Sequence, residues 1–162
     1  MAGSPSPDRD RTKKISAMRL PATLITILFA ASVAALAQKP ETVQEMAARA
    51  DAAKPDERPG MYIGIAEHQL KSADDAYTAG KVDAGQAAIN DVVTYSEKAH
   101  DAALQSNKKL KNIEIDLRKM ASRLRDIKRS LNFEDQPPVQ AAADRLENLR
   151  TDLLSKMFGK GK

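Results

Sequence analysis

The sequence predicts an all-α protein, and three observations point to this fold class. Only 4% of the 162 residues are aromatic and alanine is the commonest apolar residue, whereas strands favour β-branched and aromatic side chains. From Met61 onward, apolar residues recur in steps of three and four, which is the period of an amphipathic helix. Neither proline nor glycine occurs between Gln86 and Gln136. We therefore expect an antiparallel bundle of helical hairpins, built on one long central helix over about residues 84–131.

The first 37 residues carry the pattern of an export signal. Basic residues, ending with Arg19, precede an uncharged stretch over residues 20–37 whose apolar centre reads LITILFAASV. Ala35 and Ala37 then occupy the −3 and −1 positions before Gln38. A basic start, a short apolar centre and an A-x-A site are typical of a secretory signal peptide. The sequence thus predicts a signal peptide over residues 18–37, cleaved between Ala37 and Gln38. Residues 1–17 are then a polar extension, or Met18 is the true start.

An uncleaved membrane anchor is the alternative, because the 18 uncharged residues are just long enough to span a bilayer core. We expect a periplasmic or secreted protein, or a membrane-anchored one if the leader is retained.

The chain has no cysteine, which excludes disulfides, thiolate zinc sites, iron–sulfur clusters and a cysteine nucleophile. The folded part must therefore be stabilised by helix packing.

Three further segments are predicted around the central stretch. Residues 38–60 are acidic and rich in alanine, and they predict a short helix with a linker around residues 54–56 and 59–60. A stronger apolar stripe predicts a helix over residues 61–79, ended by Gly80 in the left-handed conformation. A last helix is expected over residues 138–158, within a helical domain of residues 61–158. Residues 159–162 are a basic tail.

The central stretch has the most regular pattern. A seam of apolar and small residues alternates steps of three and four without a phase slip: Ile89, Val92, Ser96, Ala99, Ala103, Ser106, Leu110, Ile113, Leu117, Met120, Leu124, Ile127 and Leu131. Such a repeat is typical of coiled-coil-like packing. The unbroken phase favours one continuous helix, and a break near Ser106, Asn107 and Lys108 is the alternative. Because both connections are short, we expect helix 61–79 to fold back antiparallel onto the first half and helix 138–158 onto the second.

Charge is sorted along the chain rather than evenly spread. Residues 38–162 hold 21 basic and 20 acidic side chains, yet residues 41–107 have a net charge of −6 and residues 108–130 a net charge of +6. Five basic side chains of the second segment fall along one line of a helical wheel, opposite the apolar seam; this basic line consists of Lys108, Lys111, Arg118, Arg125 and Arg129. It is a candidate site for a polyanion such as lipid headgroups or an envelope polysaccharide, and an ordinary solvated helix face is the alternative. No aromatic residue lies on it, which disfavours nucleic acid as a partner.

Motifs for catalysis or cofactor binding are missing from the sequence. It contains no glycine-rich phosphate loop, G-x-S-x-G elbow, HExxH pair or EF-hand loop. His68 and His100 are both expected to be exposed. Glu97 and His100 have the i, i+3 spacing of carboxylate di-iron bundles, but those bundles need two such motifs and only one is present. We expect no catalytic residue, no cofactor and no metal site.

These observations predict an exported helical protein with a non-enzymatic structural or protein-interaction role, in the cell envelope or outside the cell. Its partner would be a second copy of itself or another helical envelope protein. The alternative is an envelope protein that binds a polyanion through the basic outer face of residues 108–129.

Overall fold

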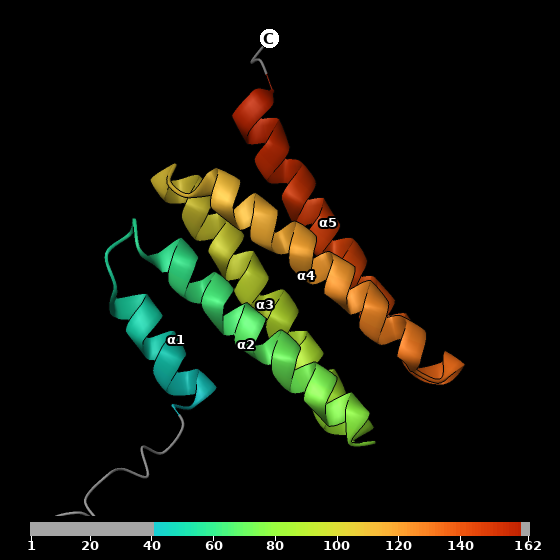
Figure 1. The fold of residues 1–162 in the computed structure, drawn as a ribbon. Coiled ribbons are helices and arrows are strands. Elements are labelled where there is room, and N and C mark those ends of the chain that lie inside the picture. Colours follow the sequence, from blue (N-terminus) through green and yellow to red (C-terminus); the bar gives the residue numbers. More distant parts are fainter. Residues whose placement is uncertain (1–40, 160–162) are drawn as a thin grey trace, which may run out of the picture. The chain divides into compact units, whose positions relative to one another are not determined.

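The computed structural model describes residues 41–159, and within this range every regular element is helical. The α-helices are α1 (Val43–Ala52), α2 (Arg58–Thr78), α3 (Val82–Ser106), α4 (Leu110–Ser130) and α5 (Gln136–Phe158), with a 3-10 turn, η1, at Phe133–Asp135 before α5 (Figure 1). The predicted all-α fold is confirmed. The predicted signal peptide and its cleavage site at Ala37 and Gln38 lie outside the described residues.

The short helix α1 is fixed at both ends. Thr42 is its N-cap: the Thr42 hydroxyl accepts a hydrogen bond from the backbone N–H of Glu45, and the Glu45 carboxylate accepts one from the backbone N–H of Thr42. This reciprocal capping box satisfies two N–H groups that a helix start otherwise leaves unpaired. The hydroxyl of Tyr62 in α2 donates a hydrogen bond to Asp51, near the other end of α1. Residues 38–60 therefore contain a capped helix that is attached to α2.

Helix α2 begins three residues before the predicted start. Pro59 lies in its first turn, where the missing N–H of proline costs nothing because that group would be unpaired anyway. The prediction of a linker at residues 59–60 is therefore wrong, while residues 53–57 do connect α1 to α2. At the other end Gly80 has φ +71, the left-handed conformation expected of it.

The predicted continuous helix over residues 84–131 is wrong. Helix α3 ends at Ser106 and α4 begins at Leu110, and between them Asn107 (φ 53) and Lys109 (φ 58) adopt the left-handed conformation. Asparagine tolerates this conformation better than most residues that carry a side chain. Ser106 and Leu110 are both partly buried, so the step of four between them continues the seam across a reversal of the chain. Continuity of phase here reflects a shared core and not a continuous helix.

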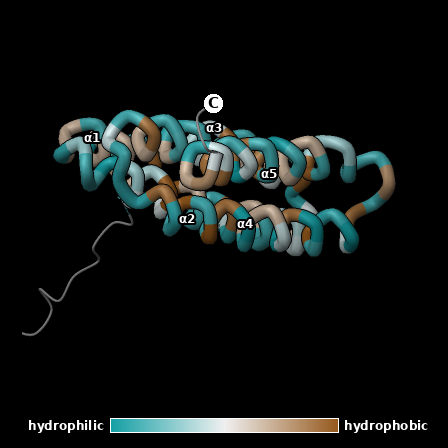
Figure 2. Tube along the Cα trace, turned by 90° about the horizontal axis from the view of Figure 1, so that it is seen from above, coloured by the Kyte–Doolittle hydropathy of each residue, from teal (hydrophilic) through white to brown (hydrophobic). Residues whose placement is uncertain are grey.

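The two hairpins pack as expected from the short connections. Helix α2 lies antiparallel to α3, and α5 lies antiparallel to α4 (Figure 1). The hairpins meet through contacts of α3 with α5 and of α2 with α4, and Figure 2 shows α3 and α5 on one side of the bundle and α2 and α4 on the other. The turn between α3 and α4 and the C-terminal end of α5 consequently lie at the same end of this bundle.

The core changes character from one hairpin to the other, as predicted. Small residues line the contact of α2 with α3, where Ala66, Ala73, Ser96, Ala99 and Ala103 are fully buried. Larger residues fill the contact of α4 with α5, including the buried side chains Ile113, Leu117, Leu124, Val139, Leu146 and Leu153. Small side chains let helix backbones approach closely, and Gly85 shows the same effect: a Cβ added there would lie 2.9 Å from ring carbons of Tyr77.

Replacing Lys109 by glycine is expected to raise the free energy of unfolding by about 0.5 to 1 kcal/mol. A lysine in the left-handed conformation carries a steric penalty that glycine avoids, and this gain exceeds the extra entropy that glycine loses on folding. Urea denaturation measures the change. The matched control is Lys119→Gly inside α4, where glycine should lower the free energy of unfolding by about 1 kcal/mol. If both substitutions destabilise the protein by the same amount, residue 109 is helical and the chain does not reverse there.

Candidate functional site

The basic line divides into a paired half and an unpaired half. In the second half of α4, the Arg125 guanidinium donates a hydrogen bond to Glu147 of α5, and Arg129 forms an ion pair of 2.9 Å with Asp126. Their charge is therefore largely compensated within the bundle. Arg125 and Arg129 belong to the basic line that the sequence predicts, but their guanidinium groups are already paired with carboxylates and are less available to an anionic partner.

Lys108, Lys111 and Arg118 form the unpaired half. All three are exposed, and within residues 41–159 none of them has an ion-pair partner. Lys108 lies in the turn between α3 and α4, so the expectation that it shares one helix face with the others is wrong. Lys111 and Arg118 are seven residues apart on α4, about 10 Å along the helix axis. These three side chains are the uncompensated part of the candidate polyanion site.

A charge network beside the paired half attaches α4 to α5. Arg150 of α5 donates to Glu114 of α4 at 2.6 Å and to Glu147 at 3.2 Å, and Glu147 also accepts from Arg125. The Glu114 side chain is only 10% exposed, so its carboxylate depends on Arg150. Partial burial tends to raise the pKa of Glu147, but the hydrogen bonds from Arg125 and Arg150 outweigh it and leave that pKa below its usual value. This network has a structural role between helices.

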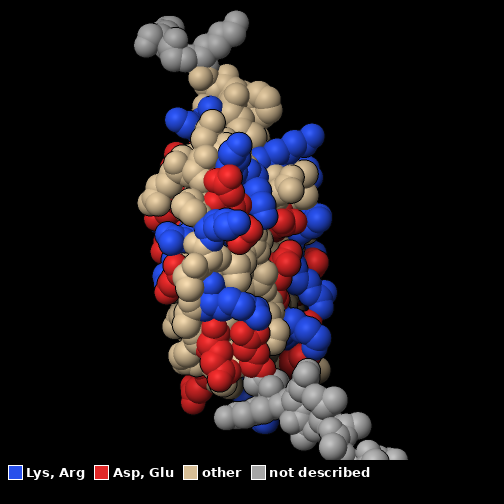
Figure 3. All heavy atoms as spheres, turned by 90° about the vertical axis from the view of Figure 1, so that its left-hand side faces the viewer, with Lys and Arg blue, Asp and Glu red and all other residues tan. Residues whose placement is uncertain are grey.

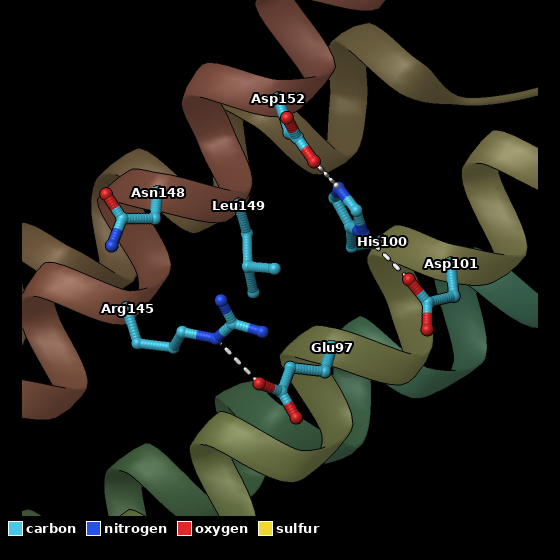
Figure 4. Close-up of a pocket in the computed structure, with 7 residues that line it drawn as sticks. All are labelled: Glu97, His100, Asp101, Arg145, Asn148, Leu149 and Asp152. Carbon is cyan, nitrogen blue, oxygen red and sulfur yellow. Dashed lines mark hydrogen bonds and ion pairs between the residues drawn. The ribbon is translucent and has the colours of Figure 1, made fainter.

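A cleft between α3 and α5 contains the other prominent cluster of polar side chains. Its volume is about 450 Å³, and its lining residues are Glu97, His100, Asp101, Arg145, Asn148, Leu149 and Asp152 (Figure 4). The sequence predicts an exposed His100, but this residue is only 5% exposed because α5 covers this part of α3, so that prediction is wrong. His68, by contrast, is exposed as predicted.

Contacts within the cleft use most of its charged groups. Glu97 accepts a hydrogen bond of 2.7 Å from Arg145, and His100 lies with Nδ1 2.9 Å from Asp101 and Nε2 3.6 Å from Asp152. The lining residues include no hydroxyl or thiol that could act as a nucleophile. Glu97 turns to Arg145 and not to a position shared with His100, and within residues 41–159 no group of three or more His, Asp or Glu side chains is placed to hold a metal ion. The Glu97–Arg145 ion pair thus connects α3 to α5 across the cleft, while His100 Nε2 is buried there without a hydrogen-bond partner in the described residues.

Sequence reasoning missed a group of side chains at one end of the bundle. Phe158, at the end of α5, is 75% exposed. Lys156 lies two residues before it and is also exposed. At the same end, Lys109 reaches from the turn between α3 and α4 to the first turn of α2, where a Cβ added to Gly60 would lie 2.8 Å from Lys109 Nζ. Only the chain reversal at residues 107–109 brings these segments together, and no local pattern indicates that reversal.

Charge is mixed elsewhere on the visible surface. On the face shown in Figure 3, basic and acidic side chains are mixed, with acidic ones gathered near its lower end and uncharged and basic ones at its upper tip. None of the helices within residues 41–159 combines the length and the apolar character that crossing a membrane requires.

Comparisons with protein-family models, with curated proteins and with solved structures found no match. The residues themselves are therefore the basis for a proposed function.

Proposed function

We propose that this chain is a non-enzymatic helical protein, exported to the cell envelope or beyond it, that binds an anionic partner. The binding groups are the unpaired half of the basic line, Lys108, Lys111 and Arg118. One observation carries this proposal: these side chains are exposed without ion-pair partners in the described residues, while Arg125 and Arg129 of the same line have them. Uncompensated cations on α4 and on the turn before it attract an anion without a loss of internal ion pairs.

A structural or protein-interaction role is the other function that the sequence predicts. Self-association would have to use remaining surface of the apolar seam. The larger seam residues, among them Ile89, Ile113, Leu117 and Leu124, are already buried within one chain. Pairing through them would require the bundle to open, which would expose apolar surface to water. The anionic partner is therefore the better supported proposal, and we expect light scattering to show a monomer.

Binding to inorganic polyphosphate tests the proposed function. In calorimetric titration of the full chain at low salt, Lys108→Gln/Lys111→Gln/Arg118→Gln should weaken binding. The binding constant should also depend less on salt: the negative slope of its logarithm against the logarithm of the salt concentration should become less steep by about two, because three cationic contacts are lost. The matched control is Lys71→Gln/Lys81→Gln/Lys119→Gln, which removes three positive charges outside the unpaired half of the basic line. Lys71 lies in α2, Lys81 in the turn between α2 and α3, and Lys119 in α4. It should retain most of the affinity.

Two results would contradict the proposal. One is the absence of binding at low salt, and the other is an equal loss of affinity in both triple variants, which would mean that only net charge matters. The basic residues before the apolar leader are present in every variant, so their contribution cancels in the comparison.

A further inference from the structure

We infer that the anionic partner is a membrane surface that contains anionic lipids, and that the bundle meets it with one end. We call this the cationic end: Lys108, Lys109, Lys111 and Lys156, together with the exposed Phe158. This inference rests on the proposed function and names the partner for it.

The fold brings these side chains to one end. Three of the lysines belong to the turn between α3 and α4 or to the first turn of α4, and Lys156 and Phe158 lie in the last turn of α5. Because α4 and α5 are antiparallel, the start of one and the end of the other lie at the same end of the bundle, where the last turns of α5 project beyond α4 (Figure 1). The contact of Lys109 with Gly60 adds the start of α2 to the same end.

Within residues 41–159 the four lysines at this end are free of ion pairs, although Asp152 lies one helical turn before Lys156 in α5. Asp56 and Glu57, which precede α2, are matched in number by Lys54 and Arg58. The opposite end differs: there the most exposed large apolar side chain, Phe133, is followed directly by Glu134 and Asp135. Phe133 is thus followed directly by two acidic residues, whereas Phe158 is preceded by Lys156.

Phe158 distinguishes a membrane from a soluble polyanion. Phe158 is preceded in α5 by Leu154, four residues earlier, and by Met157, one residue earlier. Because both of these side chains are half-buried, apolar surface continues from the core to the tip of α5. A soluble polyanion would neutralise the lysines but leave the ring in water. A membrane interface takes up an aromatic ring at the acyl boundary while lysines contact anionic headgroups. Each lysine near such a surface increases the partition coefficient of the protein between water and the membrane about five-fold.

Tryptophan fluorescence provides the test, because the chain contains no tryptophan. Phe158→Trp places a single fluorophore at the cationic end, and Phe133→Trp is the matched control at the other end, in a position that is 88% exposed. Each full-length variant is mixed at low salt with vesicles of equal parts phosphatidylglycerol and phosphatidylcholine, or of phosphatidylcholine alone. The emission of the tryptophan at position 158 should shift to the blue with the anionic vesicles only, and that at position 133 should not shift. Adding Lys108→Gln/Lys111→Gln/Lys156→Gln to Phe158→Trp should lower partitioning roughly 100-fold.

The possible failures are distinguishable. An unshifted tryptophan at position 158, or equal shifts at both positions, overturns the membrane inference. If polyphosphate binding still depends on Lys108, Lys111 and Arg118 in that case, the proposed function stands and the partner is a soluble polyanion. If that binding is absent as well, both proposals fail. The predicted signal peptide is identical in every variant, so the comparison of Phe158→Trp with and without the three lysine substitutions isolates the contribution of the cationic end.

Discussion

Leu146→Ala is expected to lower the free energy of unfolding by about 3 to 4 kcal/mol, because it truncates a large side chain at the centre of the core. Leu146 is 0% exposed in the middle of α5. Truncation removes its transfer free energy and leaves a cavity that a well-packed core closes only in part. Urea denaturation at neutral pH measures the loss. Leu154→Ala on the same helix is the control, and because Leu154 is only half-buried it should cost about 1 kcal/mol. Equal small losses would mean that α5 is not packed on the bundle.

Arg150→Met is expected to lower the free energy of unfolding by about 1.5 to 3 kcal/mol at pH 7. Methionine keeps much of the apolar stem but leaves the nearly buried Glu114 carboxylate without its cation. Removing one partner of a buried pair is costly because the other charge stays desolvated. Arg129→Met is the control, because the Arg129–Asp126 pair is exposed and should contribute less than about 0.5 kcal/mol.

The effect of Arg150→Met should depend on pH. The pKa of Glu147 is lowered in the folded state, so its contribution is present above the unfolded-state pKa, about 4.3 for a glutamate, and is lost as the pH falls through the lower folded-state value. The difference in stability between wild type and Arg150→Met should therefore shrink in acid. A difference that is constant from pH 7 to pH 3 would show that packing, and not the charge network, causes the loss.

Much of the fold follows from local pattern. The stripes of α2 and α5 contain enough steps of three and four to specify both helices and their buried faces, because helical periodicity depends on neighbours within one turn. Gly80 marks the turn after α2 correctly, since a left-handed residue there favours glycine. Short connections then imply antiparallel hairpins.

The turn at residues 107–109 illustrates what local pattern does not contain. Asn107 and Lys109 are left-handed without a glycine, and the seam runs through them in phase because Ser106 and Leu110 face one core. A heptad pattern alternates steps of three and four. The three-residue turn at 107–109 occupies one step of four, so it does not interrupt the pattern of the seam. The unbroken phase, on which the prediction of a continuous helix rested, is therefore equally compatible with a reversal at this point.

The candidate site was predictable only in part for the same reason. Its cationic residues are visible in the composition of residues 108–130, but which of them are free depends on helix α5, which supplies Glu147 to Arg125. The position of Phe158 at the same end as the lysines of residues 108–111, and the burial of His100, also depend on how the hairpins pack. Such relations between distant segments require the tertiary structure.

The core and the cationic end both depend on the reversal at residues 107–109. This reversal is tested most directly by the distance between spin labels at Ala87→Cys and Asp126→Cys, two exposed positions in a chain without cysteine. If the chain folds back, the start of α3 and the end of α4 lie at one end of the bundle, and pulsed electron paramagnetic resonance should give about 20 to 30 Å, two to three helix diameters. A distance of about 60 Å, the length of a continuous helix between these residues, would contradict the reversal and the packing that follows from it.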